Sequence, residues 1–234
     1  RIDAAHIMVA AEFSASSNCS RSLVQLSARS RLEIEQTGAI SAQTINLQTA
    51  ENGTLTISGR LAAIPSIHSE SSAILVCGFD TFLTSSAVLD ASAAGDAGSI
   101  MIGRSGATTT SSPVCEFASR TVAIDRGAVL RANSLSRGSG GRIDVWAERS
   151  VAFLGRVESR GGVRGGRGGR VEISARARLR YDGASDLSAQ SPTSRADGEL
   201  VLDPVDVVIS SSGANDTALP IIAAGDGLGQ APDT

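Results

Sequence analysis

Few residues of this chain could carry covalent or metal chemistry. The sequence holds two histidines, His6 and His68, and three cysteines, Cys19, Cys77 and Cys115. A serine nucleophile needs a base and often a Gly-x-Ser-x-Gly turn, and a structural zinc site needs closely spaced Cys or His ligands. Neither pattern occurs, so we expect no catalytic triad, no metal site and no cofactor.

The carboxylates are a second source of chemistry. Polysaccharide hydrolases work with paired carboxylates, and parallel β-helices host such enzymes. The repeats described below would stack Asp125, Glu158 and Glu172 in one set and Asp182 with Asp206 in another. We prefer the simpler interpretation that these acids occupy outward strand positions and keep the chain soluble.

The third candidate is an arginine-rich run from Arg160 to Arg170, with the sequence RGGVRGGRGGR. Such tracts bind single-stranded nucleic acid through charge and arginine stacking. No aromatic residue is interleaved here, and the glycines fall where the repeats predict a corner. We therefore expect no nucleic-acid binding, and keep contact with a polyanion such as an acidic glycan as the hypothesis for Arg160, Arg164, Arg167 and Arg170.

Composition narrows the classes of partner. The 234 residues carry a net charge of -3, and all 21 basic residues are Arg. A weakly acidic chain does not favour general binding to nucleic acid or to an anionic membrane. No apolar stretch approaches the roughly 18 residues that a spanning helix needs, so we expect no membrane-spanning segment.

The cysteines fit neither a metal knuckle nor a dense disulfide framework, because they lie 58 and 38 residues apart. Our primary interpretation is that Cys19, Cys77 and Cys115 are small buried apolar residues. A bridge between Cys77 and Cys115 is the alternative.

Internal repeats determine the expected fold. Three series of short apolar runs recur about every 28 residues and alternate apolar with polar side chains, as β-strands do. The first series starts at Ile143, Val171 and Leu200, after looser copies at Leu23, Ile45, Ile74 and Ile100. The second starts at Val122, Val151, Leu179 and Val207, after copies at Leu32, Leu55 and Phe82. The third opens on Gly127, Gly155 and Gly183.

We therefore predict an all-β fold, a right-handed parallel β-helix with three short strands per turn and about seven or eight turns. Residues 1–210 form one such helix. The 43-residue gap between Ile100 and Ile143 places a loop insertion at about 103–119. Residues 211–234 follow the last strand, and we expect a flexible C-terminal tail or exit segment there.

The stretch from Thr121 to Ser210, 90 of the 234 residues, resembles the filamentous haemagglutinin family of two-partner secretion exoproteins. The segment GGRIDVW, which begins at Gly140, is similar to the family's Gly-Gly-x-Val-x-Val-Trp strand. The segment GGRVEIS, from Gly168, is similar to Gly-Gly-x-Val-Glu-Val-Ser, and GELVLDP, from Gly198, resembles the family's closing element. Ala175 departs from the pattern, and the family's amino-terminal secretion domain is not recognisable.

The resemblance implies a large exported protein that an outer-membrane partner transporter passes to the cell surface or the medium. Its function would be adhesion to a glycan or protein on host or neighbouring cells, with this stretch as a structural shaft and not an enzyme. A β-helical polysaccharide-degrading enzyme, a lyase or glycosidase, is the alternative, and an Arg-Gly-rich polyanion-binding module is the third hypothesis. A groove lined with carboxylates would favour the enzyme.

Overall fold

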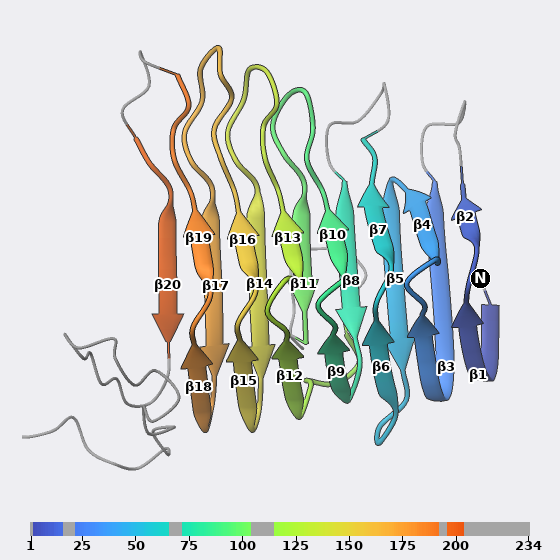
Figure 1. Cartoon of the computed structure of the whole chain (residues 1–234). Coiled ribbons are helices and arrows are strands. Elements are labelled where there is room, and N and C mark those ends of the chain that lie inside the picture. Colours follow the sequence, from blue (N-terminus) through green and yellow to red (C-terminus); the bar gives the residue numbers. More distant parts are fainter. Residues whose placement is uncertain (1, 16–21, 66–71, 104–114, 192–195, 204–234) are drawn as a thin grey trace, which may run out of the picture.

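The computed structural model describes residues 2–15, 22–65, 72–103, 115–191 and 196–203. Within these ranges every regular element is a β-strand. The strands lie side by side in curled sheets, in an order that follows the chain from β1 at one end to β20 at the other (Figure 1). The all-β part of the predicted fold is therefore confirmed. Cys19, His68, Asp206, Val207 and the predicted tail at 211–234 lie outside the described residues.

Every strand pairing is parallel, and the strands form two sheets. The smaller sheet has seven strands: β2 (Glu12–Ser14), β4 (Ala39–Ala42), β7 (Arg60–Ala63), β10 (Val88–Asp90), β13 (Val129–Arg131), β16 (Arg156–Glu158) and β19 (Ala184–Asp186).

The larger sheet has 13 strands in two wings that meet at the long strand β3 (Leu23–Ile34), which also pairs with β1 (Ile2–Val9). One wing holds β6 (Thr54–Ile57), β9 (Asp80–Leu83), β12 (Thr121–Ile124), β15 (Ser150–Phe153) and β18 (Arg178–Tyr181). The other holds β5 (Thr44–Thr49), β8 (Ala73–Cys77), β11 (Ser99–Ile102), β14 (Arg142–Ala147), β17 (Arg170–Ala175) and β20 (Glu199–Asp203).

The predicted repeats coincide with the strand register. In the first series Ile143 pairs with Val171, and Val171 pairs with Leu200. In the second, Val151 pairs with both Val122 and Leu179. Each run of three consecutive strands, such as β14 to β16, therefore adds one strand to each wing and one to the smaller sheet.

Three assignments within the repeats were wrong by one residue. Leu23 pairs with Thr44 and is exposed, so Val24 is the residue that occupies the core position beside Ile45. Phe82 does not occupy the core position of β9, because Thr81 pairs with Leu55 and is fully buried while Phe82 is 38% exposed. The Thr81 hydroxyl donates to the Gly78 carbonyl at 3.3 Å, which compensates for burying it. A shift of one residue along a strand moves each side chain to the other face.

The third series was wrong at its first step. Aligning Gly127 with Gly155 would pair Val129 with Val157, but Leu130 is the residue that pairs with Val157. The connection before β13 has four residues, 125–128, whereas the connection before β16 has two, 154–155. Corner length thus varies between repeats while the strands stay aligned.

The core is a column of aliphatic side chains from inward strand positions. Isoleucine, leucine and valine fill it along most of its length, for example Ile45, Leu61 and Ile100, each with no exposed surface. Near β18 the column also contains two aromatic rings, because Phe153 stacks on Tyr181 with 5.5 Å between ring centroids. Each such aliphatic residue contributes about 1.5–3 kcal/mol through burial.

The extra residues of the long repeat lie between β11 and β12, and residues 104–114 of that connection are outside the described ranges. The ladder continues across them, because Ile100 still pairs with Ile143. The described residues on the two sides of this segment are linked, because the Ser119 amide donates to the Gly103 carbonyl at 2.8 Å. The Arg120 guanidinium bonds Asp80 and lies 4.9 Å from the centroid of the Phe79 ring.

Cys77 and Cys115 form a disulfide, so the primary interpretation of them as unpaired apolar residues was wrong. Both are buried, as that interpretation required, and they pack with Leu75 and the partly buried Met101. Repeat spacing could not place Cys115 beside Cys77, because Cys115 belongs to the insertion and not to a strand. The bridge ties the insertion to the end of β8.

Candidate functional site

The arginine-rich run forms the connection from β16 to β17, at one corner of the strand layers. It is stacked between the connection at 132–141 and the described parts, 187–191 and 196–198, of the connection after β19, and backbone hydrogen bonds link all three. The Gly138 amide donates to the Gly165 carbonyl at 2.9 Å, and the Gly161 amide donates to the Ser188 carbonyl at 3.0 Å. The run is thus an ordered corner, unlike the flexible tracts that bind nucleic acid.

Close stacking explains why this corner needs glycine. A Cβ on Gly166 would overlap the carbonyl oxygen of Gly138, and one on Gly168 would overlap the carbonyl oxygen of Leu187. Gly166 also has a φ of +128°, which side chains disfavour. The glycines therefore serve the approach of successive backbones, which accounts for most of the motif without a ligand.

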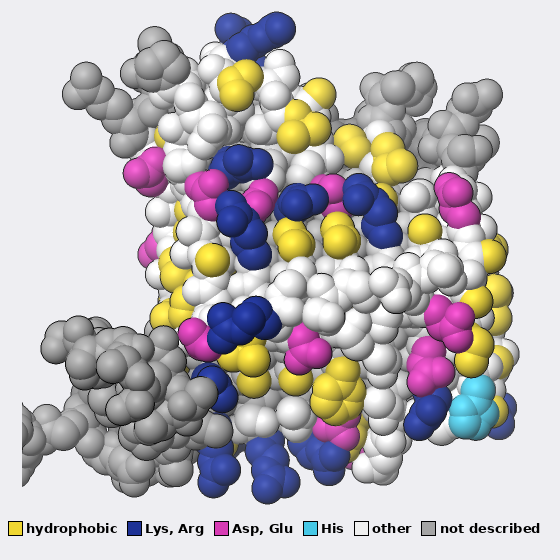
Figure 2. All heavy atoms as spheres, viewed as in Figure 1, with side chains coloured by type: hydrophobic (Ala, Val, Ile, Leu, Met, Phe, Trp, Pro, Cys, Tyr) yellow, Lys and Arg dark blue, Asp and Glu magenta, His cyan; other side chains and the backbone are white. Residues whose placement is uncertain are grey.

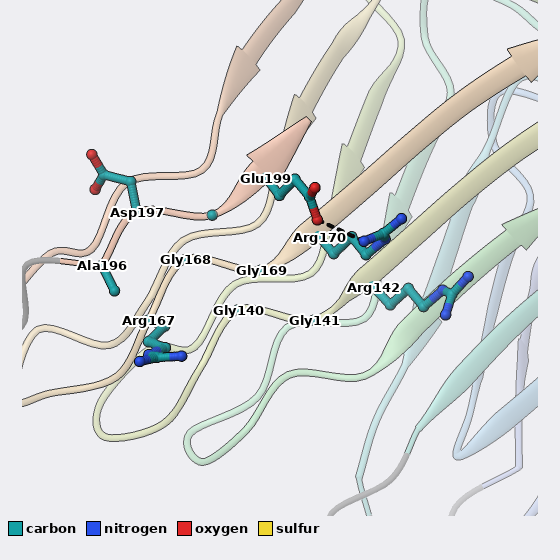
Figure 3. Close-up of a pocket in the computed structure, with 11 residues that line it drawn as sticks. Gly140, Gly141, Arg142, Arg167, Gly168, Gly169, Arg170, Ala196, Asp197 and Glu199 are labelled. Carbon is teal, nitrogen blue, oxygen red and sulfur yellow. Dashed lines mark hydrogen bonds and ion pairs between the residues drawn. The ribbon is translucent and has the colours of Figure 1, made fainter. Parts of the chain in front are cut away.

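A shallow cleft of about 550 Å³ lies between the corners at 140–142, 167–170 and 196–199 (Figure 3). Arg142, Arg167 and Arg170 line it together with Asp197 and Glu199. Arg170 points toward Glu199, and their side chains form an ion pair at 2.6 Å. The cleft therefore offers both signs of charge.

The backbone of the cleft offers little to an anion. The amides of Gly140, Gly168 and Arg170 donate to backbone carbonyls of neighbouring connections, and the Gly169 amide donates to the Ser159 carbonyl of its own connection. Anion sites built from glycine-rich turns depend on free amides that point at the ligand. Any anion here would have to be bound by side chains.

The four arginines of the polyanion hypothesis have different environments. Arg160 forms ion pairs with Glu158 at 3.3 Å and with Asp186 at 3.9 Å, and Arg170 is paired as described above. Arg164 and Arg167 are exposed and form no ion pair with any described residue. The structure therefore leaves Arg164 and Arg167 as the available cations of the run.

Below the corner, a band of acidic and basic side chains crosses the smaller sheet (Figure 2). Its centre is Glu158, whose side chain is only 7% exposed. Glu158 accepts hydrogen bonds from Arg156 at 2.6 Å and from the Asn133 amide at 3.0 Å, and it forms an ion pair with Arg131 at 3.5 Å. The sequence pointed to Glu158 and, for a different role, to Arg160, but not to Arg131 or Arg156.

The electrostatics of this band keep its carboxylates ionised. Burial alone would raise the pKa of Glu158, but the hydrogen bonds from Asn133 and Arg156 and the charges of Arg160 and Arg131 lower its pKa below the ordinary value. The pKa of Asp186, which pairs with Glu158 along the ladder, is lowered in the same way against burial, by hydrogen bonds from Ser188 and by nearby arginines. A carboxyl group with a lowered pKa is a poor source of the proton that the general acid of glycoside cleavage donates.

The other predicted carboxylates are not brought together. Asp125 lies in the exposed turn after β12, and Glu172 lies on β17 of the larger sheet, near Arg142. Asp182 follows β18 and forms ion pairs with Arg126 and Arg180. Asp125, Glu158 and Glu172 therefore form no shared groove, whereas the predicted pair of Asp182 with Asp206 stays a prediction because Asp206 lies outside the described residues. The adjacent pair is instead Glu158 and Asp186, which only the exact strand register could identify.

Comparison with known proteins gives no further information. No protein-family model matches the chain, and no curated protein sequence matches it. Within the part of the chain that the structure describes, no helix is long and apolar enough to cross a membrane. The same residues contain no group of three or more His, Cys, Asp or Glu side chains placed to bind a metal ion.

Proposed function

We propose that this chain is a right-handed parallel β-helix and forms a shaft segment of an exported adhesive protein of the filamentous haemagglutinin type. The observation that carries the proposal is the continuity of the ladders. One core position runs through Ile45, Ile74, Ile100, Ile143, Val171 and Leu200. A column of aligned, hydrogen-bonded strands makes a stiff rod, which suits a protein that holds a binding surface away from a cell.

The strand order supports the β-helical part of the proposal. Strands β1 to β19 make seven successive passages around the core, each adding to the two wings and the smaller sheet, and β20 begins an eighth. With about 4.8 Å between neighbouring strands, the rod is on the order of 35 Å long. Right-handed coiling is the general preference of parallel crossover connections.

The disulfide supports export. Disulfides persist in oxidising compartments and are rare in the reducing cytosol. The bridge between Cys77 and Cys115 is buried together with Leu75, where a reductant has little access. Export by an outer-membrane partner transporter, and a receptor that is a glycan or protein on another cell, follow from the family resemblance.

Attachment of coated beads tests the proposal. Beads carrying the full chain should attach to epithelial or bacterial cells several-fold more than beads carrying an unrelated β-sheet protein of the same net charge, and the soluble chain should compete. Equal attachment by both beads would contradict an adhesive role. The release of reducing sugar ends from a panel of polysaccharides would instead support the glycan-cleaving alternative.

A further inference from the structure

The connections at 132–141 and 159–169 form a protruding ridge beyond the ends of β13 and β16 (Figure 1). The Arg164 amide donates to the Ser136 carbonyl at 2.9 Å, which places Arg164 beside Arg137 on the neighbouring connection. We call Leu135, Arg137, Val163, Arg164 and Arg167 the loop ridge. All five are exposed.

The guanidinium groups of the loop ridge are not neutralised. Arg137, Arg164 and Arg167 form no ion pair with any residue that the structure describes. On the sheet below, by contrast, Arg131, Arg156 and Arg160 all contact Glu158. Holding like charges on neighbouring connections is unfavourable in water. An anionic partner would relieve that repulsion.

The loop ridge is also apolar at its outermost points. Leu135 is 61% exposed and Val163 is 57% exposed, whereas most large aliphatic residues of this chain are buried. Figure 2 shows dark blue and yellow side chains together at the top of the view, where these connections protrude. Cations mixed with aliphatic side chains on a convex edge match the boundary between lipid headgroups and acyl chains.

Two acidic residues lie close to the ridge, and each is engaged by a backbone amide. Asp197, which lines the cleft together with Arg167, accepts a hydrogen bond from the Ala189 amide at 2.8 Å. The Asp96 carboxylate accepts a hydrogen bond from the Ser139 amide at 2.6 Å. Backbone hydrogen bonds between the stacked connections hold the ridge in place, so little order has to be gained on binding. The net charge of -3 belongs to the whole chain and does not describe this edge.

We propose that the loop ridge docks on an anionic lipid surface, with Arg137, Arg164 and Arg167 against phosphate groups and Leu135 and Val163 among the outer acyl carbons. An acidic glycan would use the arginines but would gain little from the exposed aliphatic tips. Single-stranded nucleic acid would need stacking partners, and the ridge contains no aromatic residue. Docking along the ridge would lay the rod against the membrane.

Vesicle co-sedimentation with the full chain tests this proposal. The wild-type chain should bind vesicles containing about one third phosphatidylglycerol and not pure phosphatidylcholine vesicles, and binding should weaken as salt rises. Replacing the ridge arginines together (R137Q, R164Q and R167Q) should reduce the partition coefficient at least tenfold, because each arginine near the surface adds about a fivefold factor. L135S with V163S should reduce it several-fold and leave the salt dependence unchanged.

A matched control removes the same charge elsewhere. Arg29, Arg149 and Arg178 are also exposed and form no ion pair with described residues, so R29Q, R149Q and R178Q together should change vesicle binding less than twofold. Equal losses in both triple variants would overturn the proposal in favour of general charge attraction. Retention on heparin or RNA without vesicle binding would overturn it in favour of those partners. Unchanged far-UV circular dichroism and melting temperature in each variant show that it is folded.

Discussion

At the residue scale, burial and charge depend on neighbours that lie a full repeat away. The sequence identified Glu158 as a candidate acid, but Arg131 lies 27 residues before it and meets it only through the ladder of β13 and β16. Thr81 shows the same dependence. Its place in the core can be recognised only once the strand register pairs it with Leu55. The types of the functional residues were therefore predictable, but not their partners.

Removing the charge of Glu158 tests the band on the smaller sheet. In E158Q the guanidinium groups of Arg131, Arg156 and Arg160 lose their shared carboxylate, so the free energy of unfolding should fall by about 2 kcal/mol in urea titrations. E148Q removes an exposed partner of Arg176 and should cost less than about 0.5 kcal/mol. Equal losses would mean that the band contributes no more than a surface ion pair.

The same carboxylates predict how stability depends on pH. The folded-state pKa of Glu158 lies below the ordinary 4.5, and that of Asp186 below 3.8. Their contribution is therefore present at neutral pH and is lost as pH falls below these ordinary values toward the folded-state values. The free energy of unfolding of wild type should fall in that acid range more steeply than that of E158Q. Parallel pH profiles would contradict the assignment.

Two neighbouring glycines allow two costs of a side chain to be measured separately. One is the cost of an unfavourable φ, and the other is the cost of a clash with the stacked connection. Gly165 and Gly166 have similar φ values of +132° and +128°, but a Cβ on Gly165 would meet nothing within 4 Å whereas one on Gly166 would overlap Gly138. G165A should therefore cost about 1 kcal/mol through conformation alone, and G166A at least about 2 kcal/mol more. Chemical denaturation measures both, and equal costs would show that the stacked connections can move apart.

At the scale of elements, alternation of apolar and polar residues located strands of the larger sheet from β3 onward and the last three strands of the smaller sheet, but β1, β2, β4, β7 and β10 were not predicted. The spacing of Ile143, Val171 and Leu200 predicted their pairing correctly because strands must stay aligned to build one core. The corners were not predictable to the residue. Gly127 and Gly155 resemble each other in sequence, yet their connections differ by two residues, since a loop can change length without disturbing the ladder.

The disulfide belongs to this scale because it joins an insertion to a strand. Its cysteines are 38 residues apart, so the bridge restricts a long loop in the unfolded chain. Replacing both cysteines (C77S with C115S) should lower the free energy of unfolding by about 3 kcal/mol. A reductant present during urea unfolding, which exposes the bridge, should lower the stability of wild type to the same level and leave the double variant unchanged. A reductant effect in the double variant would contradict this assignment.

At the scale of the whole molecule, the proposed rod consists of stacked parallel strands with one charged band and one basic, partly apolar ridge. The proposed rod was suggested by the periodicity of the sequence, which is clearest from Val122 to Leu200. The ridge could not be predicted, because the exposure of Arg137 and Leu135 depends on how far the connections protrude. Sequence reasoning therefore located the Arg-Gly run but underestimated the neighbouring connection at 132–141.

Distances between spin labels test the central claim most directly. Thr56, Phe82, Ala123, Ala152 and Arg180 occupy one outward position on five neighbouring strands, β6 to β18. Spin-label pairs are placed at these positions in a chain with Cys19 replaced by Ser. Electron paramagnetic resonance should then show the separation growing by about 4.8 Å for each strand, to roughly 19 Å between positions 56 and 180. Distances that do not increase with the number of strands between the labels would contradict the stacked rod and the shaft function based on it.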